Sequence, residues 1–279
     1  MKVTVWTVVT GLVLFAWLNI AMGTSANFAA NVVVGGAAGD FCSAQDWNVL
    51  TSFRLDFDHT TDNKTACLAS GTEVGTLATG TIVTPGTPSP GSGGDALYAN
   101  ANTEYIHFDN PAPYFRSLYG ELYILFMVPA EPGSTMDFVN IYDSADDRLE
   151  LAITATGKIN ALWEDNNAGS IQEESAFDIS NACVGSSNCY DDWIQAHVIW
   201  DTTAGGNVEF GHQYRVDDNR DGDFEDGGAE DWTSMEYATG DLNEMGTEPT
   251  TDDFKFGYHD ATYQVDIYID DVEISYDQP

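Results

Sequence analysis

Basic residues are scarce in this sequence, which has nine Lys and Arg against 45 Asp and Glu and a formal net charge of −36. A nucleic-acid-binding protein needs a basic surface that displaces counterions, so this class is excluded. Anionic membrane surfaces are excluded for the same reason. Hydrophobic residues make up 43% and aromatic residues 12%, which is enough for a packed core. The composition indicates a folded protein. Its acidic residues either keep it soluble in a salty, extracellular environment or bind cations.

Cysteine is also scarce, with four residues in the chain. No Cys-x-x-Cys pair occurs and no His lies near these cysteines, which argues against a zinc site. In an exported protein an even number of cysteines indicates disulfides, and four cysteines allow three pairings. We predict Cys42–Cys67 and Cys183–Cys189, the second pair enclosing the short segment VGSSN.

Charge is missing from the N-terminus between Lys2 and Asp40. This apolar run, followed by small residues, predicts a secretory signal peptide over residues 1–26, with cleavage after Gly23 or Ala26. The alternative is an uncleaved membrane anchor, because the run is almost long enough to cross a bilayer. A single flanking Lys favours the signal peptide. We expect a secreted, extracellular protein with no other membrane contact, whose residues 27–50 form an N-terminal extension.

A sustained helical period is absent after residue 30, and short β-branched and aromatic segments bounded by Gly, Asn, Asp or Pro recur instead. These segments predict strands at 52–58, 104–109, 121–128, 137–143, 148–154, 158–165, 196–202, 207–216, 253–258 and 265–275. About ten strands with short turns predict an all-β, two-sheet antiparallel sandwich over residues 51–279. Segment 121–128 is apolar on both faces, so we expect a central strand covered on both sides. The Gly/Pro-rich segment 80–94 is expected to be a long loop within this domain.

Five motifs in order resemble the laminin-G-like branch of the concanavalin A-like sandwiches: FRLDFDHTTDN, GGDALYANANTEYIHFD, WIQAHVIWDTTAGGNVEF, DFKFGY and VDIYIDDVEIS. The resemblance covers about residues 51–277. It implies two curved antiparallel sheets in a jelly roll, a concave face often used for glycans or proteins, and often a structural calcium ion. Relatives include binding modules, adhesins and glycan-cleaving enzymes, so function has to be argued from sites.

The stretch RVDDNRDGDFEDGG, residues 215–228, places oxygen-bearing side chains on alternate residues around a glycine turn, as calcium loops do. In EF-hand register its twelfth position is Gly228 where a Glu is expected, Glu230 comes two residues later, and no helices flank it. We therefore predict a calcium-binding hairpin loop rather than an EF-hand. The alternative is a solvated acidic turn. The predicted ligands are Asp217, Asn219, Asp221, Asp223 and Glu225.

The closing segment 265–275 carries a second group of acids. Its apolar alternation changes phase at Asp270 and Asp271, which predicts a β-bulge that redirects these carboxylates. The resemblance implies that this strand pairs with the opening strand, which would bring Asp56 or Asp58 nearby and form a second calcium site. The alternative is an edge strand whose acids prevent edge-to-edge pairing.

Catalytic motifs are weak. The Glu-x-Asp-x-x-Glu string of related glycoside hydrolases is absent. Segments 193–200 and 254–264 are faintly similar to strings of alginate-type lyases, which would make His197 the neutraliser or base and Tyr258 or Tyr263 the acid. Such an enzyme needs several basic residues to hold a polyanion, and few are present. We expect no enzyme.

Aromatic residues near predicted strand ends, including Trp232 and Tyr237, are able to stack on sugars but more often fill or cap a core. We predict no particular ligand contact among them. The function predicted from the sequence is a secreted, non-catalytic, calcium-stabilised recognition or surface module that binds a neutral or cationic glycan or a protein. One alternative is a structural subunit of an extracellular filament or surface layer, which self-associates by exchanging its N-terminal extension. The other is a polysaccharide-degrading enzyme.

Overall fold

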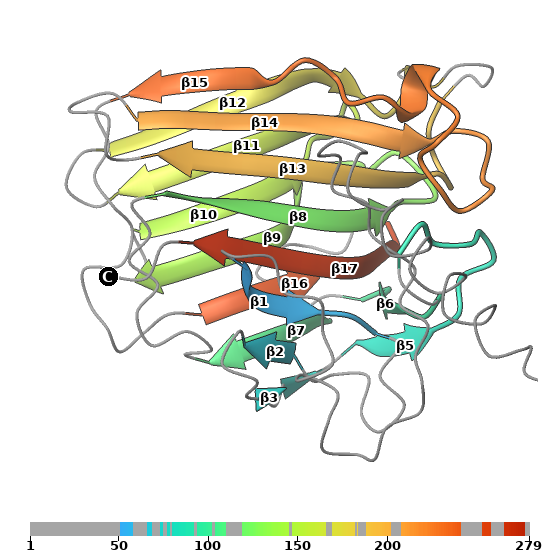
Figure 1. Ribbon diagram of the computed structural model, residues 1–279, viewed down its shortest axis with the longest axis horizontal. Helices are drawn as coiled ribbons and strands as arrows, with labels where there is room; N and C mark the ends of the chain where they lie inside the picture. Colours follow the sequence, from blue (N-terminus) through green and yellow to red (C-terminus); the bar gives the residue numbers. More distant parts are fainter. Residues whose placement is uncertain are drawn as a thin grey trace, which may run out of the picture.

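The computed structural model shows two antiparallel β-sheets packed face to face as a sandwich (Figure 1). It describes residues 51–57, 66–68, 73–74, 77–78, 80–91, 94–101, 104–109, 119–144, 147–165, 169–181, 183, 188–201, 208–240, 253–257 and 265–276. The all-β, two-sheet fold predicted from the sequence is confirmed. In the described part of the chain, no helix is long and apolar enough to cross a membrane.

One sheet has ten strands in its described part, with the path β15-β14-β13-β8-β17-β1-β2-β3 and a branch in which β6 pairs with β17 and β5. It lies in front in Figure 1. Its strands are β1 (Thr51–Leu55), β2 (Ala66–Leu68), β3 (Glu73–Val74), β5 (Thr81–Val83), β6 (Ala96–Ala99), β8 (Tyr119–Met127), β13 (Trp193–Asp201), β14 (Val208–Asp217), β15 (Glu236–Gly240) and β17 (Ile267–Tyr276).

The other sheet lies behind it and has seven described strands in the order β12-β11-β10-β9-β16-β7-β4. Its strands are β4 (Leu77–Ala78), β7 (Tyr105–Asp109), β9 (Met136–Ser144), β10 (Asp147–Ile153), β11 (Lys158–Asp165), β12 (Gly169–Asp178) and β16 (Asp253–Gly257). All ten segments predicted as strands form strands. The ten predicted segments do not include the short strands β2 to β6, and the expectation of a loop over 80–94 is wrong for β5 (Thr81–Val83), which pairs with β6. They also lack β12, because the charged segment QEES interrupts its apolar pattern, and β15 (EYATG), which is short and weakly apolar.

The core lies between the sheets and is built from alternate residues of each strand. Phe53 of β1 shows how the layers join, because its ring lies edge-on to Phe108 at 5.2 Å and to Phe254 at 5.1 Å, both in the opposite sheet. Such edge-to-face pairs stabilise a core beyond the area that they bury. Phe53, Phe108 and Phe254 are at most 1% exposed.

Strand β8 is central and covered on both faces, as its sequence predicts. Leu122, Ile124 and Phe126 face the main core. Leu125 and Met127 face outward and pack with Ala96 and Trp193 in a second apolar cluster. This second cluster supports the loops that follow β14, because Phe224 packs against it.

Several sequence-based predictions fall outside the described residues: the signal peptide, the N-terminal extension, Cys42 and Asp58. Cys67 lies in β2, paired with Arg54 of β1 in the strand register.

Candidate metal centre

The acidic loop begins where β14 ends, at Asp217, whose side chain is fully buried. Oδ1 accepts a hydrogen bond from the backbone N–H of Asp221 at 3.2 Å, and Oδ2 accepts one from Gly222 at 3.0 Å. Gly222 has a φ of 89°, a conformation that glycine adopts without strain. Burial raises the pKa of Asp217 to about 6, although these backbone donors favour the ionised form.

Glu230 closes the same loop from the short 3₁₀ turn η2 (Gly228–Glu230) and is 1% exposed. Its Oε2 accepts a hydrogen bond from the backbone N–H of Asp226 at 2.7 Å. Its Oε1 is buried and has no hydrogen-bond partner in the described structure. Burial raises the pKa of Glu230, and the nearby Asp226, Asp218 and Asp217 raise it further. A buried carboxylate oxygen without a protein partner is costly, so this oxygen is suited to binding a cation.

Asp217, Asp221 and Glu230 each place a ligand oxygen within 4.8 Å of the other two. Carboxylate oxygens gathered around one point are donors that calcium prefers. Asn219 lies beside this group, since its Nδ2 donates to Asp221 Oδ2 at 3.1 Å and to Asp226 Oδ2 at 2.7 Å. These residues fit a hard divalent cation.

The structure thus brings together Asp217, Asn219 and Asp221, three of the residues predicted as ligands. Asp223 and Glu225 are not part of the converging group and are exposed. Asp223 Oδ1 accepts a hydrogen bond from the backbone N–H of Glu225 at 2.8 Å, which shapes the loop. A Glu is expected at the twelfth position of an EF-hand loop, which is Gly228 in this sequence. Glu230 supplies that carboxylate instead, because the turn η2 brings it close to Asp217.

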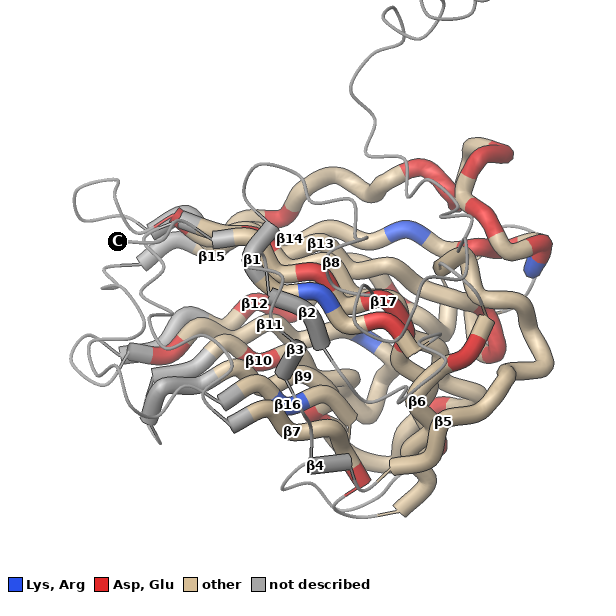
Figure 2. Tube along the Cα trace, turned by 60° about the horizontal axis from the view of Figure 1, so that its bottom comes forward, with Lys and Arg blue, Asp and Glu red and all other residues tan. Residues whose placement is uncertain are grey.

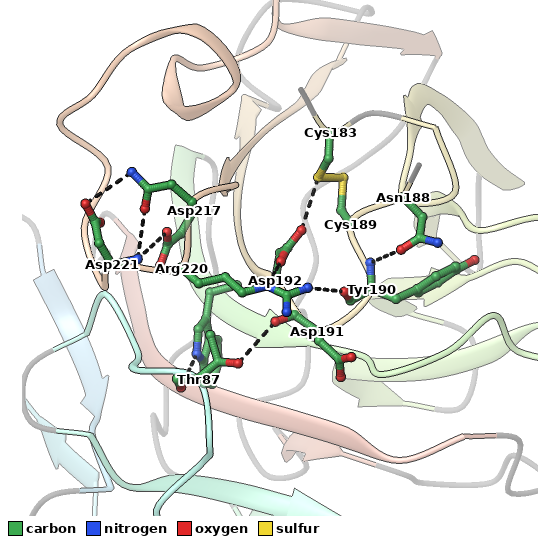
Figure 3. Close-up of polar contacts among 12 residues, drawn as sticks. Thr87, Cys183, Asn188, Cys189, Tyr190, Asp191, Asp192, Asp217, Arg220 and Asp221 are labelled. Carbon is green, nitrogen blue, oxygen red and sulfur yellow. Dashed lines mark hydrogen bonds and ion pairs between the residues drawn. A yellow bond between two sulfur atoms is a disulfide. The ribbon is translucent and has the colours of Figure 1, made fainter. Parts of the chain in front are cut away.

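An ion pair fastens this loop to the neighbouring one (Figure 3). The Arg220 guanidinium pairs through Nε with Asp192 Oδ1 and donates from Nη2 to the backbone oxygen of Tyr190 at 3.0 Å. The Asp192 side chain is 1% exposed, and burial raises its pKa while Arg220 opposes that effect. Arg220 has a φ of 63°, unusual for a residue with a side chain. The contact therefore holds Arg220 in a conformation that it would otherwise disfavour.

The predicted disulfide between Cys183 and Cys189 is present, beside this ion pair (Figure 3). Cys183 Sγ lies 3.4 Å from Asp192 Oδ2, a contact rather than a donated hydrogen bond because a disulfide sulfur carries no proton. The segment expected as a long loop reaches the same place, since Trp193 Nε1 donates to the backbone oxygen of Thr87 at 3.1 Å. The disulfide, the ion pair and the loop together brace the end of the sandwich that carries the candidate metal centre.

Acidic residues gather at this end of the sandwich, where β14 runs into the loop (Figure 2). The closing strand adds Asp270 and Asp271, which are 0% and 2% exposed. The strand register shifts between Asp270 and Val272, so the predicted bulge is confirmed. Because of this bulge, the apolar residues of β17 before and after it face the same core. Ser89 Oγ donates to Asp270 Oδ2 at 2.6 Å, and both carboxylates approach Gly91.

The predicted pairing of the closing and opening strands is also confirmed, with Leu55 opposite Val272. Asp56 follows Leu55 and Asp271 precedes Val272, so both lie next to that pair on the same side. Asp56 is 6% exposed. The strand register thus brings Asp56, Asp270 and Asp271 to one end of the β1–β17 pair.

An aromatic and polar surface covers the outer face of β8, β13 and β14. The rings of Tyr123 and His197 stack at 4.1 Å, and Trp232 lies 5.8 Å from the His197 ring. Arg215 lies over both Phe224 and Trp232, with its guanidinium carbon 4.2 and 4.6 Å from the two ring centres. Cation–π contacts of this kind fix an arginine without a carboxylate. Phe224 and Trp232 belong to the acidic loop and to the segment just after Glu230, so the candidate metal centre and this surface share one stretch of chain.

His197 does not have the setting of a lyase base. Its Nε2 lies 3.0 Å from Glu121 Oε2 and its Nδ1 lies 2.9 Å from Gln213 Nε2. Strand β16, which carries the second lyase-like string, belongs to the opposite sheet, and its Phe254 and Phe256 fill the core. Tyr258 and Tyr263 lie outside the described residues. The two strings are therefore explained as sandwich strands.

No family model and no curated protein sequence matches this chain. Solved structures do match. The receptor-binding domain of botulinum neurotoxin D is 11% identical over 82% of this chain and 50% of that chain, with a TM-score of 0.54. The binding domain of Paraclostridial Mosquitocidal Protein 1 is 13% identical over 82% of this chain and 49% of that chain, with a TM-score of 0.55.

The binding domain of botulinum neurotoxin DC, in complex with SialylT, is 10% identical over 83% of this chain and 49% of that chain, with a TM-score of 0.53. The chain thus spans about half the length of the solved chains that it matches. At these identities the likeness establishes the fold alone, an antiparallel β-sandwich.

Proposed function

We propose that this chain is a secreted, non-catalytic recognition module that binds a glycan or a protein surface and is stabilised by calcium. One observation carries the proposal: the candidate metal centre and the aromatic surface around Trp232 belong to the same segment, residues 217–232. Trp232 is partly exposed, although it is held between Arg215 and the ring of His197. A cation at Asp217, Asp221 and Glu230 stiffens a loop that presents side chains to a partner.

Calcium is proposed because the donor set is made of hard oxygen atoms and includes a buried carboxylate oxygen without a partner. Asp270 and Asp271, with Asp56 beside them, remain proposed ligands of a second calcium ion at the bulge of β17. The bulge and the β1–β17 pairing support the finer proposal that the sandwich is of the laminin-G-like kind.

The recognition role is supported by analogy of fold. The three solved structures reported above are named as receptor-binding or binding domains, and one of them was solved in complex with SialylT. The same fold serves unrelated activities, so the analogy has to be tested. A non-catalytic role also agrees with the placement of His197 and β16 in different sheets.

The test uses the purified chain, produced by secretion, on a glycan array and against candidate surface proteins, with calcium and with a chelator. The proposal expects binding that calcium strengthens and no release of sugar ends. Release of sugar ends or unsaturated products would show an enzyme and contradict it. Calcium-dependent polymers, disrupted by deletion of residues 27–40, would establish the filament or surface-layer alternative instead.

A further inference from the structure

A cleft of about 460 Å³ lies directly beside the candidate metal centre. One wall is the segment that follows η2, with Gly228, Asp231, Trp232 and Ser234, and the other wall comes from β12, with Phe177. The cleft therefore lies where the edge strands β12 and β15 of the two sheets approach each other. Small-molecule sites commonly have ~300–1,000 Å³, so this volume accommodates a ligand.

The lining combines aromatic rings, hydroxyls and carboxylates. Trp232 and Phe177 offer apolar surface, Ser234 offers a hydroxyl, and Asp231 and Glu236 offer carboxylates. Glu236 is held in place, because its Oε2 accepts a hydrogen bond from the backbone N–H of Ala176 at 2.8 Å. A sugar ring has an apolar face and polar edges, which such a lining matches.

The charge of the cleft selects among sugars. Its lining has two carboxylates and no Lys or Arg. The Lys158 ammonium pairs with Glu174 at 2.8 Å. The Arg215 guanidinium lies over the ring of Trp232 as well as that of Phe224, so it contacts a lining residue without being part of the lining. In a chain of net charge −36, a positively charged ligand is attracted and an anionic sugar is repelled.

We propose that this cleft binds a protonated amino sugar, with its ring against Trp232 and its ammonium group near Asp231 and Glu236, and that calcium in the adjacent loop organises the site. We expect this metal dependence because Glu230, a ligand of the proposed metal, lies in the sequence between Gly228 and Asp231. Both of these neighbours line the cleft. The inference rests on the proposed recognition function and names the ligand class of that function.

Calorimetric titration of the whole chain with short glucosamine oligomers, with calcium and with chelator, tests the inference. We expect binding in calcium that weakens about tenfold in Trp232→Ala and in Glu236→Gln, as for central contacts of a site. Glu230→Gln and chelator should weaken binding as strongly. Fully N-acetylated oligomers, which carry no charge, should bind at least about tenfold more weakly than glucosamine oligomers.

Two matched variants separate a built cleft from general attraction to an acidic surface. Glu225→Gln removes an exposed acid of the same loop outside the cleft, and Tyr237→Ala removes an exposed aromatic residue that does not line it. Both should leave the affinity unchanged. Thermal unfolding of each variant shows that the fold is retained.

Each other outcome has a defined meaning. If glucosamine oligomers bind with equal affinity to wild type, Trp232→Ala and Glu236→Gln, the cleft is not the site, although the recognition function stands. If N-acetylated oligomers or a lysine-rich peptide bind as well as glucosamine oligomers, the ligand class is wrong. If glucosamine oligomers do not bind, the inference is overturned, and binding on the glycan array decides whether the proposed function survives.

Discussion

The carboxylates of Asp217 and Glu230 lie within 4.8 Å of each other, and both side chains are buried. Asp217 ends strand β14, whereas Glu230 ends the turn η2. Like charges at this separation repel each other, and burial weakens the screening by water. In the proposed calcium site, a divalent cation between them replaces this repulsion with attraction, so its binding is expected to remove an electrostatic cost of the loop.

The glycine turn of the loop provides the first prediction. Gly222→Ala adds a Cβ 3.2 Å from that of Pro88, at a φ of 89° where only glycine is unstrained. We expect a loss of more than about 1 kcal/mol in the free energy of unfolding. Gly86→Ala is the matched control, because nothing lies within 4 Å of its added Cβ. Chemical denaturation in calcium measures both, and equal effects of the two variants would contradict this account of the turn.

The ion pair between Arg220 and Asp192 provides the second prediction. Arg220→Met leaves the carboxylate of Asp192 buried without its partner, and we expect a loss of about 2 kcal/mol in the free energy of unfolding. The double variant Arg220→Met/Asp192→Asn removes the buried charge as well and should recover most of that loss. Denaturation of the single and double variants gives the coupling between the residues. A single variant as stable as wild type would show that the pair does not fasten the loop.

A buried histidine provides a prediction of pH dependence. His212 is fully buried, neither ring nitrogen has a hydrogen-bond partner in the described structure, and burial lowers its pKa below the ordinary value of 6.5. The unfolded chain takes up this proton as the pH falls through 6.5, whereas the folded chain does not. The unfolded state then binds more protons, so stability present above pH 6.5 is lost as the pH decreases.

The variant His212→Phe removes this proton uptake. We expect the loss of stability between about pH 7.5 and 5.5 to be smaller than in wild type by about 1 kcal/mol. Urea denaturation at several pH values and constant calcium concentration measures the difference. Parallel pH profiles of the two proteins would show that His212 is not held in its neutral form.

The strands were predictable because alternation and β-branching act locally, and segments such as 265–269 show both properties. The bulge of β17 was predictable for the same reason, since a change of phase at Asp270 and Asp271 has to be accommodated within one strand. The strand β12 was not, because its acidic residues hide the alternation that buries Ser175 and Phe177.

The arrangement of the candidate metal centre was predictable only in part. Asp217, Asn219 and Asp221 follow the spacing of a known loop, but the position of Glu230 depends on the turn η2, which no local pattern fixes. The partnership of Arg220 with Asp192 was equally hidden, because residues from separate loops meet only in the folded chain. Trp232 was noted among aromatic residues near strand ends, but its relation to Arg215 required the structure.

The most direct test of the account is a set of thermal and chemical unfolding curves of wild type, Glu230→Gln and Glu225→Gln, each with calcium and with chelator. We predict that calcium at ~100-fold above its Kd stabilises wild type and Glu225→Gln by about 3 kcal/mol. Glu230→Gln should show little stabilisation by calcium but be more stable than wild type in chelator, because it lacks one of the repelling buried charges. No calcium effect on wild type, or an equal effect on Glu230→Gln, would contradict the metal centre.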